Sequence, residues 1–398
     1  MTNSDPSRIP LARPDIGVDE EEEVLAVLRS GRLALGPRAL ELERQVAAFT
    51  GFPAAVAVSS GAAALHLAVH ALGIGPDDCV VTTPFSFIAS SNCLRYEGAE
   101  PVFVDIDRDT LCLSPELLRR YLDSCKDDGE HLRDPRSGRR VAGVLPVDVF
   151  GHPADLPAIL DVARAWRLPV IADSCEALGS RYRRADGAWV HAGAGADVAT
   201  LAFYPNKQVT TGEGGMVLAA DPDLEERIGS LRNQGRRPGD SWLYHSRLGF
   251  NYRLDELSAA LGVAQMRRVD DILARRAAVA GWYAEALAGV DGIELPRAAP
   301  WARPAWFVQA LRVAGDVDRD RLVEVLERNG IEAKAYFEPP IHRQPPYAGD
   351  DSLLGTPLPE TEEASARTLV VPFWAAMTEE HVARVADALR RAIAEVRR

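Results

Sequence analysis

Lysine is almost absent from this chain of 398 residues, although Lys and Arg together number 45. The only lysines are Lys126, Lys207 and Lys334, and all other basic side chains of this count are arginines. Arginine stays charged in proteins, whereas the amine of a lysine can lose its proton when it is buried. Each lysine in such a composition is therefore a candidate for chemistry that requires an amine.

Disulfide patterns, long apolar runs and a positive net charge are missing as well. The five cysteines are scattered and form no CxxC pair, which is typical of reduced thiols. No 18 apolar residues follow one another, so we expect no membrane-spanning helix, and the polar N-terminal stretch does not resemble a signal peptide. The net charge of −13 argues against nucleic acid or an anionic membrane as the partner. We therefore predict a cytoplasmic globular protein.

Several well-defined catalytic motifs do not occur. The chain contains no GxGxxG, GxxxxGK[ST], HExxH or GxSxG sequence, which argues against dinucleotide, P-loop, zinc-protease and serine-hydrolase sites. His66 and His70 are four residues apart on a predicted helix and could in principle ligate a metal. That helix face is otherwise apolar and offers no carboxylate, so we predict no metal site.

Short apolar strand patterns alternate with helical patterns through the first 220 residues. This alternation indicates an α/β fold with a mostly parallel sheet covered on both faces. Strands are predicted over 54–60, 79–84, 101–107, 142–150, 168–174, 197–205 and 214–220, and helices over 18–50, 61–73 and 154–166. The stretch 125–141 fits neither pattern, and we predict an exposed loop there.

The pattern restarts near residue 302 as a smaller α+β unit. It consists of predicted strands over 306–313, 331–336 and 369–373, a helix over 319–330 and a last helix from Thr378. We therefore predict two domains: residues 1–250 form an N-terminal segment and a large α/β domain, and residues 251–398 form interface helices and a small α+β domain.

Three polar clusters follow predicted strands, at the edge where open α/β sheets bind ligands. Ser60 and Gly61 open an Ala-rich helix, which suits either a bound phosphate or a plain N-cap. Asp173 ends the strand LPVIADS and either caps the next helix or points into the central crevice. Lys207 lies between a strand end and a Gly-rich turn, either on the surface or as a desolvated amine that forms a Schiff base.

Taken together, the three clusters favour one cofactor. A phosphate site at a helix N-terminus, a carboxylate for a pyridinium nitrogen and a lysine for an imine are the groups that pyridoxal 5′-phosphate requires. The carboxylate keeps the ring nitrogen protonated, so that the ring withdraws electrons. The lysine, once a substrate amine has displaced it, can move a proton.

Ordered motifs from about Pro10 to the last helix give the chain a wider resemblance. It resembles the DegT/DnrJ/EryC1/StrS family of sugar aminotransferases, which are fold-type I pyridoxal-phosphate enzymes. The motifs are SGRLALGPRALELERQVAAFTG (30–51), VSSGAAALHLAV (58–69), TTPFSFIASSNC (82–93), PVFVDID (101–107), DVFGHPAD (148–155), ADSCEALGS (172–180), FYPNKQVTTGEGGM (203–216), LGFNYRLDELSAALG (248–262) and AYFEPPIHRQPPY (335–347).

The resemblance implies roles for individual residues of the cofactor site. Lys207 would form the Schiff base, and Asp173 would bind the nitrogen of the pyridine ring. Ser60 and Gly61 would lie at the phosphate, and Phe87 would stack on the ring.

The resemblance also implies a homodimer with shared active sites. Asn251 would reach the cofactor phosphate of the other subunit, and Arg253 would lie near that subunit's substrate pocket. Tyr336 and His342 would face the nucleotide-sugar substrate.

Three positions depart from the common pattern of the family. Ala62 and Ala202 replace a frequent Thr and a frequent Ser, so the phosphate should depend more on backbone amides, Ser60 and Asn251. Glu176 stands where many members have Gln or His, beside the hydroxyl of the ring. Whether this carboxylate is protonated there or accepts a hydrogen bond stays open.

The resemblance implies a transaminase that takes an amino group from glutamate, or glutamine, and passes it to a keto-sugar. A nucleotide-linked keto-deoxy-sugar, for a surface polysaccharide or an antibiotic, is the first expectation. A cyclitol ketone, an elimination or decarboxylation reaction, and a non-enzymatic cofactor-binding regulator are the alternatives. Family members that act as dehydratases have histidine in place of the lysine, and Lys207 excludes that branch.

Overall fold

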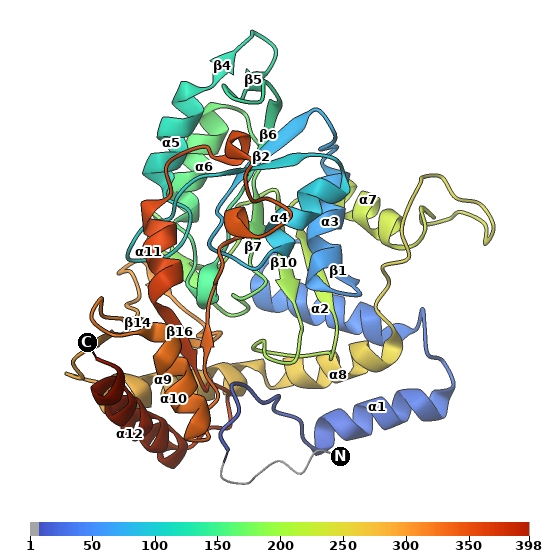
Figure 1. Ribbon diagram of the computed structural model, residues 1–398. Coiled ribbons are helices and arrows are strands. Elements are labelled where there is room, and N and C mark those ends of the chain that lie inside the picture. Colours follow the sequence, from blue (N-terminus) through green and yellow to red (C-terminus); the bar gives the residue numbers. More distant parts are fainter. Residues whose placement is uncertain (1–7, 398) are drawn as a thin grey trace.

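The computed structural model describes residues 8–397. A large α/β lobe carries a smaller C-terminal lobe, drawn in orange and dark red in Figure 1. Helix α1 (Val18–Ser30) lies below the large lobe, and a segment near residue 240 projects from its side.

The centre of the large lobe is one continuous sheet. Its strands lie in the order β3 (Glu100–Phe103), β2 (Asp78–Thr82), β6 (Arg140–Leu145), β7 (Ile171–Asp173), β10 (Val198–Ala202), β11 (Gly215–Ala219) and β1 (Ala54–Val58). Parallel bridges from Val144 to Val170 and from Val147 to Asp173 join β6 to β7. Of these strands, β11 alone runs in the opposite direction to the other six. The predicted mostly parallel sheet is confirmed.

Helices flank this sheet, and several of them begin at a side chain that accepts a backbone hydrogen bond. They are α2 (Pro37–Thr50), α3 (Gly61–Ala71), α4 (Ala89–Tyr96), α5 (Pro115–Ser124), α6 (Leu156–Ala165), α7 (Pro222–Arg232) and α8 (Glu256–Arg267). Ser60, Asp155 and Asp221 cap α3, α6 and α7. Helices α1 and α2 end at glycines, Gly31 and Gly51, whose φ angles are 71° and 76°.

The smaller lobe is built on an antiparallel sheet with its own apolar core. The strand order is β12 (Ile293–Glu294), β14 (Gln309–Val313), β16 (Thr368–Val371) and β15 (Lys334–Ala335). Helices α9 (Val269–Ala286), α10 (Arg319–Arg328), α11 (Pro359–Arg367) and α12 (Glu379–Val396) accompany it. A three-stranded sheet of β13 (Ala302–Arg303), β8 (Arg181–Arg183) and β9 (Trp189–His191) joins the two lobes. The domain boundary at residues 250/251 stays a prediction.

The predicted loop over 125–141 is wrong in part. Two short strands, β4 (Lys126–Asp127) and β5 (Leu132–Arg133), form a hairpin that pairs with the first residue of β6, Arg140, through Arg133. Buried Asp134 anchors this hairpin, because its carboxylate accepts hydrogen bonds from the Tyr121 hydroxyl at 2.8 Å and from the Ser137 amide at 2.6 Å. The turn between β4 and β5 is held by Asp128, whose Oδ1 accepts the amides of Glu130 and His131. The polar composition therefore hid carboxylates that bind the backbone.

Within residues 8–397, no helix combines the length and the apolar character that a bilayer crossing requires.

Candidate active site

The carboxyl ends of β1, β7 and β10 meet at one edge of the sheet. A methyl group added at Gly61, after β1, would lie 2.7 Å from the Ala202 Cβ at the end of β10. The same added atom would lie 3.3 Å from the Cys175 Sγ, just after β7. Burial raises the pKa of the Cys175 thiol, Asp173 raises it further, and Lys207 acts in the opposite direction. The three sequence clusters therefore surround one point.

Asp173 ends β7 and is 95% buried, with 5% of its surface exposed. Its Oδ2 accepts a hydrogen bond from the Ser90 hydroxyl at 2.7 Å, and its Oδ1 accepts one from the Cys175 amide at 3.2 Å. The Ser90 hydroxyl lies 2.9 Å from that of Ser86. This carboxylate therefore combines a local turn contact with an anchor on α4, and both fix its orientation.

The amine of Lys207 lies between a carboxylate and an aromatic ring. Its Nζ is 3.3 Å from Oε1 of Glu176 and 3.8 Å from the centre of the Phe307 ring. Only 12% of the lysine side chain is exposed. Of the two readings that the sequence left open, the structure favours the buried amine over the surface lysine.

Glu176 presents its two carboxylate oxygens to different groups. Oε2 accepts the Phe150 amide at 2.8 Å, so Oε1 is the oxygen that faces Lys207. Phe150 lies in the 3-10 turn η1 (Val149–Gly151) with a φ of 57°. Burial raises the pKa of Glu176, while Lys207 and the Phe150 amide oppose this rise. Because a backbone amide can only donate, a proton bound to Glu176 would belong on Oε1.

The start of α3 forms a narrow cradle. Ser60 Oγ accepts the Ala63 amide at 3.0 Å and thereby caps the helix, so its own hydroxyl proton stays available. The first amides of a helix have no intrahelical acceptor, and those of Gly61 and Ala62 are of this kind. A side chain at Gly215 would come within 2.4 Å of the Ser60 carbonyl oxygen. The cradle thus combines backbone donors with positions where only glycine fits.

Aromatic side chains gather around the same region. The rings of Phe85, Phe150 and Phe337 lie within 6 Å of one another, between centres, and Tyr336 packs against the latter two. Burial raises the pKa of Tyr336 to about 12, and Glu176 adds to this rise. Tyr336 is therefore close enough to Glu176 to be influenced by its charge, and its predicted contact with the substrate stays a prediction.

Phe87 lies in the turn before α4. Its side chain is 64% exposed, although Ser86 and Ser90 on either side of it are buried. An exposed aromatic ring beside the Asp173 network is available to cover a bound ring, so its predicted stacking role stays open.

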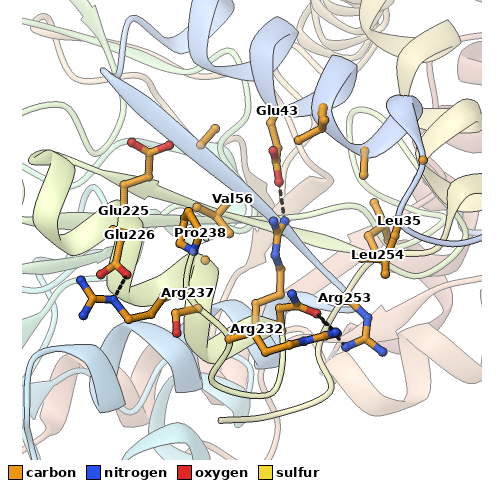
Figure 2. Close-up of a pocket in the computed structure, with 18 of the residues that line it drawn as sticks. Leu35, Glu43, Val56, Glu225, Glu226, Arg232, Arg237, Pro238, Arg253 and Leu254 are labelled. Carbon is orange, nitrogen blue, oxygen red and sulfur yellow. Dashed lines mark hydrogen bonds and ion pairs between the residues drawn. The ribbon is translucent and has the colours of Figure 1, made fainter. Parts of the chain in front are cut away.

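Asn251 and Arg253 lie on a segment that runs beside β1. The Ser59 amide donates to the Tyr252 carbonyl at 2.9 Å, and Val58 pairs with Arg253. Asn251 is exposed. Arg253 lines a groove of about 580 Å³ between α2, β1 and α7, where it donates to Asn233 Oδ1 at 3.1 Å (Figure 2). Burial lowers the pKa of Arg253, and Arg236 and Arg232 lower it further.

His342 contacts α11 of the smaller lobe and β3 of the large lobe. In the turn η2 (Ile341–Arg343), its Nε2 lies 2.7 Å from Glu362 Oε1, and its ring packs 6.4 Å from that of Phe103. The Nδ1 atom is buried and has no hydrogen-bond partner among residues 8–397. These contacts do not bring His342 to Lys207, and its predicted contact with substrate stays a proposal.

The predicted absence of a carboxylate beside His66 and His70 is wrong. Glu97, at the end of α4, lies 2.6 Å from His66 Nε2 and 3.0 Å from His70 Nδ1. The Tyr252 hydroxyl lies 3.0 Å from His66 Nδ1. Among residues 8–397 no group of three or more His, Cys, Asp or Glu side chains has the arrangement of a metal site. This carboxylate was missed because it reaches the helix from another element.

The sequence analysis did not identify three of the residues that surround the site. Ser90 holds Asp173, Phe150 donates its amide to Glu176, and Phe307 covers Lys207. Ser90 and Phe150 at least lie within motifs, TTPFSFIASSNC and DVFGHPAD. Phe307 lies 100 residues from the lysine in an ordinary strand pattern.

Comparison with known proteins gives concordant results. A model of the DegT/DnrJ/EryC1/StrS aminotransferase family matches residues 14–390. The chain is 36% identical over 390 residues to a GDP-perosamine synthase of Caulobacter vibrioides, covering 97% of this chain and 98% of that relative. It is 35% identical over 380 residues to the dTDP-3-amino-3,4,6-trideoxy-alpha-D-glucose transaminase of Streptomyces venezuelae, with coverages of 95% and 93%. The crystal structure of S. venezuelae DesV aligns with a TM-score of 0.85 and 34% identity, with coverages of 96% and 98%.

The site has the donors and acceptors that pyridoxal 5′-phosphate needs. The cradle of Ser60 and Gly61 suits its phosphate, the buried carboxylate of Asp173 suits its ring nitrogen, and the Lys207 amine suits its aldehyde. The chain belongs to the DegT/DnrJ/EryC1/StrS aminotransferase family and depends on pyridoxal 5′-phosphate.

Proposed function

We propose that the protein transfers an amino group from glutamate, or glutamine, to the keto group of a nucleotide-linked keto-deoxy-sugar. The observation that carries this proposal is the enclosed Lys207 amine, 3.3 Å from Glu176 at the same sheet edge as Asp173. The relatives support the substrate class, because their names are those of a GDP-sugar and a dTDP-sugar enzyme. The product would be an amino sugar for a surface polysaccharide or an antibiotic.

The bound cofactor would supply an electron-withdrawing ring that stabilises negative charge on the reacting carbon. Asp173 would accept the hydrogen bond of the protonated ring nitrogen, and Ser90 would keep this carboxylate in place. Lys207 would anchor the cofactor and, once released, move a proton with its Nζ. Glu176 would hold a proton on Oε1 or accept one there, next to that amine.

A homodimer with shared active sites belongs to the same proposal. The segment that projects from the large lobe in Figure 1 carries strongly exposed apolar side chains, including Trp242 at 70%, Leu243 at 84% and Leu248 at 87%. Such a cluster is typical of a surface that is covered by another protein. Asn251 follows this segment and is exposed, so a second copy would bring it to a neighbouring phosphate.

A screen of acceptors tests the proposed reaction. The enzyme, loaded with cofactor, is incubated with glutamate or glutamine and a panel of GDP-, dTDP- and UDP-linked keto-sugars, and products are followed by mass spectrometry. We expect amination of at least one nucleotide sugar, and Lys207→Ala as the control should abolish it. Amination of a cyclitol ketone alone would assign the alternative substrate. Salt-sensitive DNA binding without any amine transfer would instead indicate a regulator.

A further inference from the structure

The Lys207 amine faces an aromatic ring that comes from a different lobe. Phe307 lies in the segment that leads into β14, is 2% exposed, and presents the face of its ring 3.8 Å from Lys207 Nζ. The face of an aromatic ring carries negative electrostatic potential and attracts a cation, most strongly where water is excluded. An ammonium group at this position is therefore stabilised on one side by Glu176 and on the other by Phe307.

The backbone around Phe307 is held from two sides. Its amide donates to the Phe150 carbonyl at 3.2 Å, and its carbonyl accepts Nη2 of Arg276 at 2.7 Å. Arg276, on α9, is itself buried, and its Nε donates to the Trp306 carbonyl at 3.0 Å. A side chain at Gly151 would come within 3.1 Å of the Phe307 amide, so this turn packs directly against the segment. The ring over Lys207 is thus placed by contacts to both lobes.

The turn that supports Phe307 also supports Glu176. Phe150 accepts the Phe307 amide with its carbonyl and donates its own amide to Glu176 Oε2. One residue of η1 therefore fixes both neighbours of the amine. Other ionisable groups that act on this region are Asp148, Asp173, the Cys175 thiol and the Tyr336 hydroxyl.

We propose that Phe307 is a positioning residue that holds the released Lys207 amine in its ammonium form, between its ring face and Glu176, while the amino group resides on the cofactor. A lysine that leaves the cofactor must return to it in every catalytic cycle. Contact with the face of the Phe307 ring fixes the position of this amine and limits the motion of the lysine side chain. The proposal rests on the assignment of Lys207 as the cofactor lysine made above.

The test uses the enzyme loaded with pyridoxamine 5′-phosphate, whose amine cannot form an imine with lysine. Isotope-labelled acetic anhydride modifies neutral amines, and peptide mass spectrometry gives the rate for each lysine. The chain offers internal references, because Lys126 and Lys334 are exposed and are the only other lysines. Phe307→Leu should raise the Lys207 rate at pH 7 about tenfold, which corresponds to about 1.4 kcal/mol. Phe307→Tyr keeps the ring face and should stay near the wild-type rate.

Fluorinated phenylalanines at position 307 separate the charge effect from packing. Mono-, di- and trifluoro rings keep nearly the same shape while the negative potential of the face decreases, so the Lys207 rate should rise stepwise along the series. A flat series would overturn the proposal, even if Phe307→Leu fails to fold or opens the site. As a matched control, Trp189→Leu removes a cation–π contact of equal length, 3.8 Å, with Arg303, and should leave the Lys207 rate unchanged.

A separate measurement tests the assignment on which the proposal rests. Borohydride reduction of the enzyme loaded with pyridoxal phosphate identifies the cofactor lysine by peptide mapping. An adduct on another lysine would refute the role of Lys207, and with it the positioning role, whatever the fluorinated series gives. An adduct on Lys207 together with a flat series would refute the role of Phe307 alone.

Discussion

Replacement of Asp173 by Asn tests the central electrostatic contact of the proposed site. Asp173 is nearly fully buried, and each of its oxygens already accepts one hydrogen bond, from Ser90 and from the Cys175 amide. An asparagine can keep both contacts, because its oxygen can face the Cys175 amide while the Ser90 hydroxyl turns to accept from the amide nitrogen. The fold and the cofactor affinity should therefore be nearly preserved. What disappears is the negative charge.

The expected loss follows from that charge. A charged or strongly oriented contact in a site that excludes water typically contributes about 3 kcal/mol to a transition state, which is roughly a hundredfold in rate. The assay follows the change in cofactor absorbance that glutamate or glutamine produces under single-turnover conditions, which requires no knowledge of the sugar. Asp173→Asn should slow this step about a hundredfold.

A neighbouring carboxylate offers a matched control. Asp148 is equally buried, at 5% exposure, and accepts hydrogen bonds from the Ser174 hydroxyl and the Ala154 amide. Asp148 has no proposed role at the cofactor. Asp148→Asn should therefore reduce the rate of the half-reaction by less than Asp173→Asn does. An Asp173→Asn enzyme with near-normal rate would refute the reasoning. An equal loss in both variants would assign the effect to general packing of buried polar groups.

Three further predictions concern the cradle, the dimer and pH. Gly61→Ala should weaken cofactor binding and destabilise the fold by about 1–3 kcal/mol, because the added methyl group meets the Ala202 Cβ at 2.7 Å. A second substitution, Ala202→Gly, should restore part of the lost stability, as measured by thermal unfolding. Mixing Lys207→Ala with Asn251→Ala subunits should restore activity if Asn251 acts across the interface, since one site of a mixed dimer is then intact; mixing should restore nothing if it acts within its own subunit. Burial raises the pKa of Asp148 to about 7, above its unfolded value, so the stability from this group is complete below about pH 4 and decreases as pH rises toward 7. Denaturant titrations should show a smaller decrease over this window in Asp148→Asn.

Local patterns were sufficient for the elements that carry the site. The buried strands and the helix caps depend on neighbouring residues, and the α3 cap at Ser60 appears as expected. The placement of Asp173 and Lys207 at one edge follows from a general property of parallel strands, whose carboxyl ends share an edge. The hairpin within 125–141 was missed, because the buried carboxylate of Asp134 that anchors it looks like any polar residue in a charged stretch.

Long-range partners could not be obtained in this way. Glu97 reaches His66 from the end of α4, and the periodicity of neither helix predicts this contact. The amide of Phe150, a residue with a left-handed backbone conformation, binds Oε2 of Glu176. This contact leaves only Oε1 to face Lys207. Such contacts depend on how whole elements approach one another, which local spacing does not specify.

The sequence by itself determined the α/β class, the scarcity of lysine, and the positions of a candidate phosphate cradle, a carboxylate and an amine at the ends of three predicted strands. These properties depend on residue type and on spacing within a single element. The tertiary structure alone decided that the Lys207 amine is enclosed, with Glu176 on one side and Phe307 on the other. The physical reason is that burial and charge compensation arise only when segments 31 and 100 residues away from the lysine pack against it.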